Sequence, residues 1–143
     1  MSLLSPKRLC IGLAPDRVEL ARVHSGLRGA VVGEAQARVC VPEAGAKPWT
    51  AALATLEQLL GEPTAKAGEA RVTLSNHFVR YLVLPWDSAL LGTDELHAAA
   101  TQHFERVFGD TAVEWELRVS PGEFGEPVLA CAIDRTLLEA LDA

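Results

Sequence analysis

Residues 71–86 read RVTLSNHFVRYLVLPW and residues 93–108 read TDELHAAATQHFERVF, and these two stretches decide the fold. The first is rich in Val, Leu, Tyr and Phe, which favour extended backbone. Pro85 stands at its end, where a strand loses an N–H without breaking its ladder. It therefore predicts one strand, or two strands in succession with a bend at residues 75–77.

The second stretch has the pattern of an amphipathic helix. Its apolar side chains recur every three or four residues. Thr93 is the predicted N-cap, with two acidic residues in the first turn, and Gly109 is the predicted stop. The residues on the apolar side are Leu96, Ala99, Ala100, His103, Phe104 and Val107.

The chain before this centre predicts three strands and a helix. The strands are expected at residues 9–13, 17–23 and 30–41, joined by short turns into an antiparallel meander. The helix is expected to carry an apolar stripe from Trp49 to Leu60, with Pro48 at a position that the first helical turn tolerates and Gly61 at its end. We interpret its leucine stripe as core packing rather than as a surface for a partner.

The chain after the centre predicts two strands and a last helix. Residues 112–119 alternate charged and apolar, as in a half-buried strand. Residues 128–133 form a continuous apolar run, which is typical of a strand covered on both faces. Asp134 is placed to cap a helix over residues 135–141. The resulting order of strands and helices predicts an α/β or α+β fold.

Composition excludes several classes of function. The net charge of −6 with scattered basic residues argues against nucleic-acid binding. The odd number of cysteines, without a CxxC pair, predicts reduced thiols in a reducing cytosol. No apolar run approaches 18 residues, and the amino terminus lacks the apolar core of a signal peptide. We therefore expect a cytoplasmic chain with no membrane insertion in this segment.

The sequence carries no recognisable catalytic or metal-binding motif. His97 and His103 lie six residues apart, about 240° around a helix, so they do not share a face. No HExxH, CxxC or GxSxG pattern occurs in the sequence. We therefore predict that the chain holds no metal or other cofactor and is not an enzyme.

Several segments together resemble the amino-terminal half of the proteins of a known bacterial family. Residues 11–15 (IGLAP) and 18–23 (VELARV) look like its opening strands, residues 78–85 (FVRYLVLP) like the strand that enters its small inserted subdomain, and residues 129–134 (LACAID) like its return strand. The family is the actin-like cytoplasmic assembly proteins of type IV pilus and type II secretion systems, of the PilM and GspL type.

The resemblance implies an actin-like, ribonuclease-H-like half-fold with a β-meander, a helix and a small inserted subdomain. Its expected parts are a main-lobe portion at residues 1–76, the inserted subdomain at 77–133 and a return helix to the main lobe at 134–143.

The first hairpin departs from the pattern of active actin-like ATPases. Those proteins carry an acidic residue here, close to metal-bound phosphates, whereas this chain has Ala14. Gly12, Ala14 and Asp16 therefore form a degenerate phosphate turn, in which Asp16 does not rebuild the cradle. The second phosphate loop and the adenosine pocket of such folds lie in their second half, outside these 143 residues.

The resemblance implies a non-catalytic scaffold on the cytoplasmic face of the inner membrane. Its partners would be other pilus or secretion assembly proteins, such as an inner-membrane component or an assembly ATPase. Acidic residues in the subdomain would steer a basic partner, and the candidate contacts are Tyr81, Trp86, Glu114 and Glu116. The alternatives are an amino-terminal fragment of an actin-like ATPase, of a sugar-kinase-like phosphotransferase or of a cell-division actin homologue.

Overall fold

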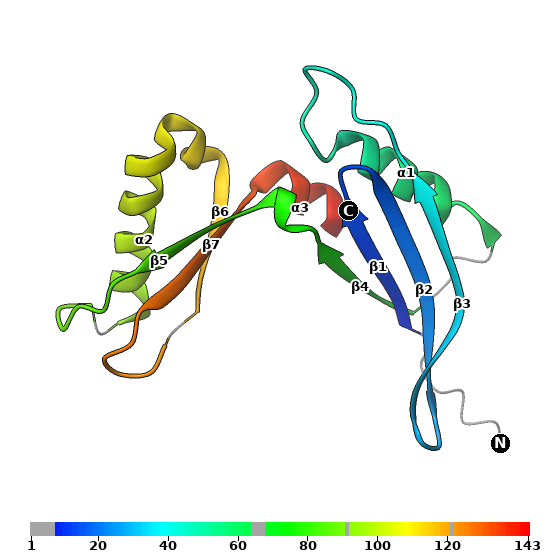
Figure 1. Cartoon of the computed structure of the whole chain (residues 1–143), viewed down its shortest axis with the longest axis horizontal. Helices are drawn as coiled ribbons and strands as arrows, with labels where there is room; N and C mark the ends of the chain where they lie inside the picture. The colour runs from blue at the N-terminus through cyan, green and yellow to red at the C-terminus, as the bar shows by residue number, and fades with distance from the viewer. Residues whose placement is uncertain (1–7, 64–67, 91, 121) are drawn as a thin grey trace. The chain divides into compact units, whose positions relative to one another are not determined.

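The computed structural model describes residues 8–63, 68–90, 92–120 and 122–143. The amino terminus, where no signal peptide is expected, lies outside these residues. The chain divides into two compact units, Met1–Phe78 and Val79–Ala143 (Figure 1). Across the described residues the predicted order of strands and helices is confirmed, with two short 3-10 helices in addition.

The first unit contains a mixed four-stranded sheet. Its strands are β1 (Arg8–Ala14), β2 (Arg17–Gly26), β3 (Gly29–Val39) and β4 (Glu69–Leu74), in the order β3-β2-β1-β4. β1 and β2 pair antiparallel with Leu13 opposite Val18, so the predicted hairpin is confirmed. β4 pairs parallel with β1 after a crossover through a helix, because a parallel neighbour cannot be reached by a tight turn.

Helix α1 (Thr50–Leu60) makes that crossover and contacts β2. It begins one residue later than predicted, because the first α-helical hydrogen bond runs from the Leu53 N–H to the Trp49 carbonyl. Trp49 is thus the N-cap, and Pro48 precedes the helix instead of lying in its first turn. Mostly aliphatic side chains form the buried core of this unit, together with one thiol and one aromatic ring: Leu9, Ile11, Leu13, Val18, Leu20, Cys40, Ala52, Leu56, Leu59 and Phe78.

The second unit contains an antiparallel three-stranded sheet. Its strands are β5 (Val79–Leu84), β6 (Trp115–Ser120) and β7 (Val128–Asp134), in the order β5-β7-β6. The apolar run of β7 is explained by its central position, hydrogen bonded on both sides. The prediction that β7 is covered on both faces is wrong at Leu129, whose side chain is 46% exposed.

Helix α2 (Thr93–Phe108) packs on this sheet and supplies an aromatic centre for the core (Figure 1). Phe104 is fully buried, stacks on Phe108 and meets the edge of Trp115. The small side chains of Ala130 and Ala132 on β7 belong to the same buried cluster. Alanine at these positions leaves room for the large rings.

Two helix boundaries in this unit differ from the sequence prediction. Gly92, not Thr93, is the N-cap of α2, and its N–H donates to Glu95 Oε2 at 2.6 Å. The strand predicted from residue 112 begins only at Trp115, because residues 109–114 form the 3-10 helix η3 (Gly109–Glu114). Gly109 ends α2 as predicted, with a positive φ of 69°.

The remaining boundaries agree with the sequence. The apolar stretch is two strands in succession, β4 and β5, separated by the 3-10 helix η2 (Asn76–Phe78) and placed in different sheets. Helix α3 (Arg135–Asp142) is capped by Asp134, whose Oδ1 accepts from the Thr136 N–H at 2.9 Å. Helix α3 falls in the second unit, and its return to the main lobe stays a prediction.

Candidate functional site

The turn between β1 and β2 is short and has few free donors. Ala14 lies opposite Arg17, so Pro15 and Asp16 alone make the turn. Pro15 has no N–H to offer. Among the described residues positive φ occurs only at glycines, so neither turn residue adopts the left-handed backbone. The turn therefore lacks the consecutive N–H groups that cradle a phosphate.

Cys40, the residue that follows β3, contacts this turn. The Cys40 N–H donates to the Asp16 carbonyl at 2.9 Å, and Cys40 Sγ lies 3.4 Å from the Pro15 carbonyl. Burial raises the pKa of the Cys40 thiol; a hydrogen bond with Thr55 lowers this pKa, and the Asp16 charge raises it further. The sulfur is thus a protonated thiol that packs against the turn, and the Cys40 N–H holds the turn's backbone in place.

The acidic groups near the turn pair with an arginine. The Asp16 carboxylate is 68% exposed and lies 3.8 Å from the Arg17 guanidinium, whose Nε donates to Glu19 Oε1 at 2.8 Å. Gly12 lies opposite Glu19 in the sheet, and a Cβ on Gly12 would meet Glu19 Oε2 at 3.4 Å. The carboxylate beside Gly12 is thus Glu19 rather than Asp16.

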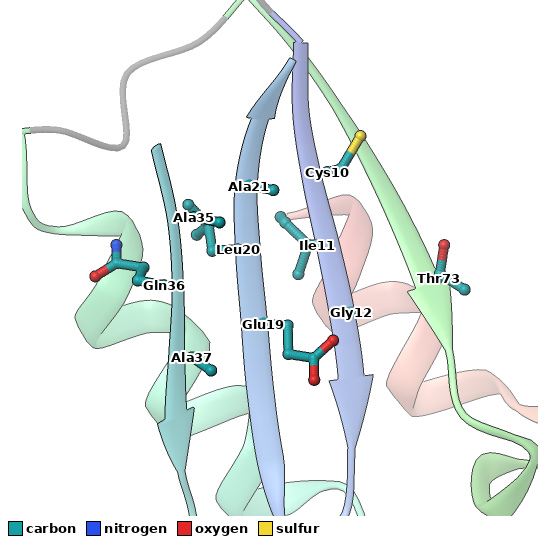
Figure 2. Close-up of a pocket in the computed structure, with 10 residues that line it drawn as sticks. All are labelled: Cys10, Ile11, Gly12, Glu19, Leu20, Ala21, Ala35, Gln36, Ala37 and Thr73. Atoms are coloured by element: carbon teal, nitrogen blue, oxygen red, sulfur yellow. The ribbon is translucent and has the colours of Figure 1, made fainter. Parts of the chain in front are cut away.

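Small side chains leave a shallow cavity of about 550 Å³ on this sheet (Figure 2). Cys10, Gly12, Ala21 and Ala37 line it, with Glu19, Gln36 and Thr73 as polar members. Sequence reasoning missed Glu19 and Thr73, although the charged-apolar alternation of residues 17–23 already placed Glu19 on the wet face. One carboxylate bound to arginine, one amide and one hydroxyl supply neither a cation nor a run of backbone N–H donors, the groups that hold a phosphate.

Two of the four partner candidates share one face of the second sheet. Tyr81 lies opposite Cys131, and Glu116 lies opposite Ile133 on the other side of β7. Alternation puts both on the face away from the α2 core, where Tyr81 and Val83 are 48% and 62% exposed. Glu116 forms an ion pair with Arg118 on its own strand at 3.2 Å.

The other two candidates lie elsewhere. Glu114 ends η3 and is not in a strand. Trp86 follows β5, is 41% exposed and meets the ring of Phe124 at 5.2 Å between centroids. Sequence reasoning missed Phe124, because it lies in a loop and has no periodic partners. The structure therefore brings Tyr81 and Glu116 together on one sheet face and places Trp86 and Glu114 at opposite ends of the sheet, next to Val128 and Asp134 of β7.

Comparison with known proteins identifies the fold through structure alone. No family model matches the chain, and no curated protein sequence matches it. The cytoplasmic domain of EpsL, an inner membrane component of the type II secretion system of Vibrio cholerae, matches with a TM-score of 0.62 at 15% identity, over 95% of this chain and 51% of that one.

A second solved structure has the same fold. A Bacteroides thetaiotaomicron protein with an actin-like ATPase fold and unknown function matches with a TM-score of 0.53 at 10% identity, over 96% of this chain and 48% of that one. The predicted actin-like half-fold is therefore confirmed, and the chain spans about half the length of the structures it matches. None of the described helices is long and apolar enough to cross a membrane.

Proposed function

We propose that this chain is a non-catalytic scaffold of a type II secretion or type IV pilus machine and binds other assembly proteins at the cytoplasmic face of the inner membrane. The structural likeness to the cytoplasmic domain of EpsL supports the link to secretion. The single observation that carries the non-catalytic part is the closed turn at Pro15 and Asp16.

Three properties of this turn disfavour a nucleotide. It offers few backbone donors, because one of its two residues is proline. It is held closed by the Cys40 N–H and by the buried sulfur beneath it. Asp16 in the turn and Glu19 on β2 are acidic, and these carboxylates repel the phosphates of a nucleotide.

The second unit supplies the surfaces for partners. Its sequence has twelve acidic against four basic residues, so its net charge is −8. Such a field speeds association with a basic partner. We assign the contacts to Tyr81 and Glu116 on the sheet face, to Trp86 after β5 and to Glu114 at the end of η3, with an inner-membrane component or an assembly ATPase as the partner.

Calorimetry with MgATP tests the non-catalytic part. We expect no saturable heat from the wild-type chain. Asp87→Ala, which removes a carboxylate from a loop of the other unit, is the matched control for Asp16→Ala. Micromolar binding that Asp16→Ala abolishes and Asp87→Ala preserves would contradict the proposal.

Binding to a purified assembly protein encoded beside this chain tests the scaffold part. We expect saturable binding whose association rate falls with added salt, because the acidic residues act at long range. Glu116→Lys should slow association more than it speeds dissociation. Binding that is indifferent to both changes would remove Glu116 from the contact surface.

The second candidate function is the amino-terminal part of an actin-like ATPase, of a sugar-kinase-like phosphotransferase or of a cell-division actin homologue. The Bacteroides protein supports it, because that structure is described as an actin-like ATPase fold. Saturable MgATP binding in the calorimetry would favour this candidate over the scaffold.

A further inference from the structure

The second unit has an apolar groove between two loops, at the end of the sheet where β5 stops and β7 starts. Its volume is about 240 Å³. One side comes from the loop between β5 and α2 and the other from the loop between β6 and β7. We call it the Trp86 groove, and its apolar lining is Pro85, Trp86, Leu90, Leu96, Phe124 and Val128.

Two aromatic rings at the groove remain in contact with water. Trp86 is 41% exposed and Phe124 is 84% exposed, and the rings meet edge to face with an interplanar angle of 70°. The buried cluster of the unit, built around Phe104, includes neither ring. Exposed aromatic side chains that do not serve the core are typical of a binding surface.

The rim of the groove is acidic. Asp87, Glu123 and Glu126 line it. Asp87 Oδ1 accepts from the Ala89 N–H at 2.9 Å, which orients this carboxylate. In the described part of the chain none of these three carboxylates takes part in an ion pair. The surrounding unit, with its net charge of −8, offers few cations to balance them.

We propose that the Trp86 groove seats a lysine or arginine side chain from a basic segment of a protein partner. The aliphatic stem would lie along the apolar lining, as long basic side chains do elsewhere. The cation would meet the aromatic rings and form charge-assisted hydrogen bonds with the rim. This inference deepens the protein-binding function proposed above, because it names the chemistry that the partner presents.

Charge also favours a basic segment over two other possible occupants of the groove, a membrane surface and a second copy of this chain. An exposed Trp–Phe pair suits a membrane surface, but the acidic rim repels anionic lipids. A second copy of this chain would bring another unit of charge −8 against the first. A basic segment alone satisfies both the apolar lining and the rim.

A peptide titration followed by NMR tests the proposal directly. The probe is a five-residue peptide, acetyl-Gly-Leu-Lys-Leu-Gly-amide, with two matched forms that carry Nε-acetyllysine or glutamate at the centre. We expect the lysine form to shift the Trp86 indole N–H and the Phe124 amide saturably. Acetylation keeps the stem and removes the charge, so it should weaken binding at least tenfold, and glutamate should abolish it.

Two variants place the binding on the groove. Phe124→Ala should weaken the lysine peptide several-fold without unfolding the chain, because this ring is 84% exposed. Val113→Ala is its control, since Val113 is a 63% exposed apolar side chain of the same unit outside the groove. Glu123→Gln should weaken binding and reduce its dependence on salt.

Four outcomes would overturn the proposal. They are equal binding of the acetyllysine peptide, equal loss in Phe124→Ala and Val113→Ala, binding to phosphatidylglycerol vesicles in place of the peptide, and self-association through these loops. None of these outcomes tests the proposal that the chain is a non-catalytic scaffold. MgATP binding would contradict that proposal without contradicting the proposed role of the Trp86 groove. The failure of the groove and the failure of the scaffold are therefore distinguishable.

Discussion

Each unit is a helix packed on a small sheet, but the two units differ in the side chains of their cores and in their charge. The first unit has an aliphatic core and nine basic against seven acidic residues, which form ion pairs such as Arg8–Glu69 and Arg38–Glu62. The second has an aromatic core around Phe104 and twelve acidic against four basic residues. The first unit can balance its charges internally, whereas the second has an acidic excess that only solvent or a partner can balance.

This difference separates the parts of the molecule by role. The turn that was compared with a phosphate turn lies in the first unit, where the Cys40 N–H donates to the Asp16 carbonyl and Arg17 pairs with Asp16 and Glu19. The exposed aromatic and acidic residues lie in the other unit. The proposed partner contacts therefore lie in a different unit from the turn at Pro15 and Asp16.

The largest expected effect is the loss of the aromatic core. Phe104→Ala should destabilise the second unit by about 3–5 kcal/mol, because it removes a fully buried ring and leaves a cavity. Hydrogen exchange should show lost protection in β5, β6 and β7 and retained protection in β1 and β2. Phe124→Ala is the control, with a change below about 0.5 kcal/mol because that ring is exposed. Equal loss of protection in both sheets would show that the two cores unfold as one.

The cysteines allow a comparison of the units by reactivity. Cys40 of the first unit is 6% exposed, whereas Cys131 of the second is half-buried. A thiol-specific disulfide reagent at pH 8 should modify Cys131 at least about tenfold faster, because Cys131 is more accessible and the raised pKa of Cys40 lowers the thiolate fraction of Cys40. Mass spectrometry of the labelled peptides measures the two rates. Similar rates would show that the turn above Cys40 opens readily.

The same thiol predicts a dependence of stability on pH. Burial raises the pKa of Cys40 in the folded chain, so the folded state holds this proton more tightly than the unfolded state. The resulting stability is fully present below the unfolded pKa of about 8.5 and is lost as the pH rises through the folded pKa. Denaturant unfolding above pH 8.5 should therefore lose stability more steeply in the wild type than in Cys40→Ala. Parallel pH profiles would contradict the shift.

The amino-terminal ends of helices α1 and α2 also differ between the two units. Helix α2 has a side-chain cap from Glu95, whereas α1 has none at Trp49. Glu95→Ala should cost about 1 kcal/mol, because the Gly92 N–H loses its acceptor. Thr93→Ala, at the residue that the sequence suggested as the cap, should cost only a few tenths of a kcal/mol. Urea unfolding measures both, and the reverse order would support Thr93 as the cap.

The smallest expected effect concerns salt. In the first unit, Arg8→Met removes a pair that is 41% and 58% exposed, so the cost should be below about 1 kcal/mol and vanish in 1 M salt. In the second unit, added salt should slightly stabilise the fold, because it screens repulsion among the excess acids. Residue-specific hydrogen exchange at two salt concentrations measures whether added salt raises or lowers the stability of each unit. The same sign in both units would remove the electrostatic contrast.

The sequence alone determined the order of the strands and helices and the antiparallel hairpin that opens the chain. Periodicity identified α2 and the β2 strand, because the spacing of apolar residues depends only on local geometry. The sequence also shows Ala14 at the position where the resemblance places an acidic residue in active actin-like ATPases. These properties depend on residues that are close in the sequence.

Tertiary structure alone decided how distant residues meet. It placed β4 and β5 in different sheets, put Glu19 rather than Asp16 beside Gly12, and brought Phe124 to Trp86 across two loops. It also set the start of α2 at Gly92, because a side chain three residues later reaches back to that N–H. Pairing between strands and contact between loops bring together residues that are far apart in the sequence. The local spacing of apolar residues does not predict such contacts.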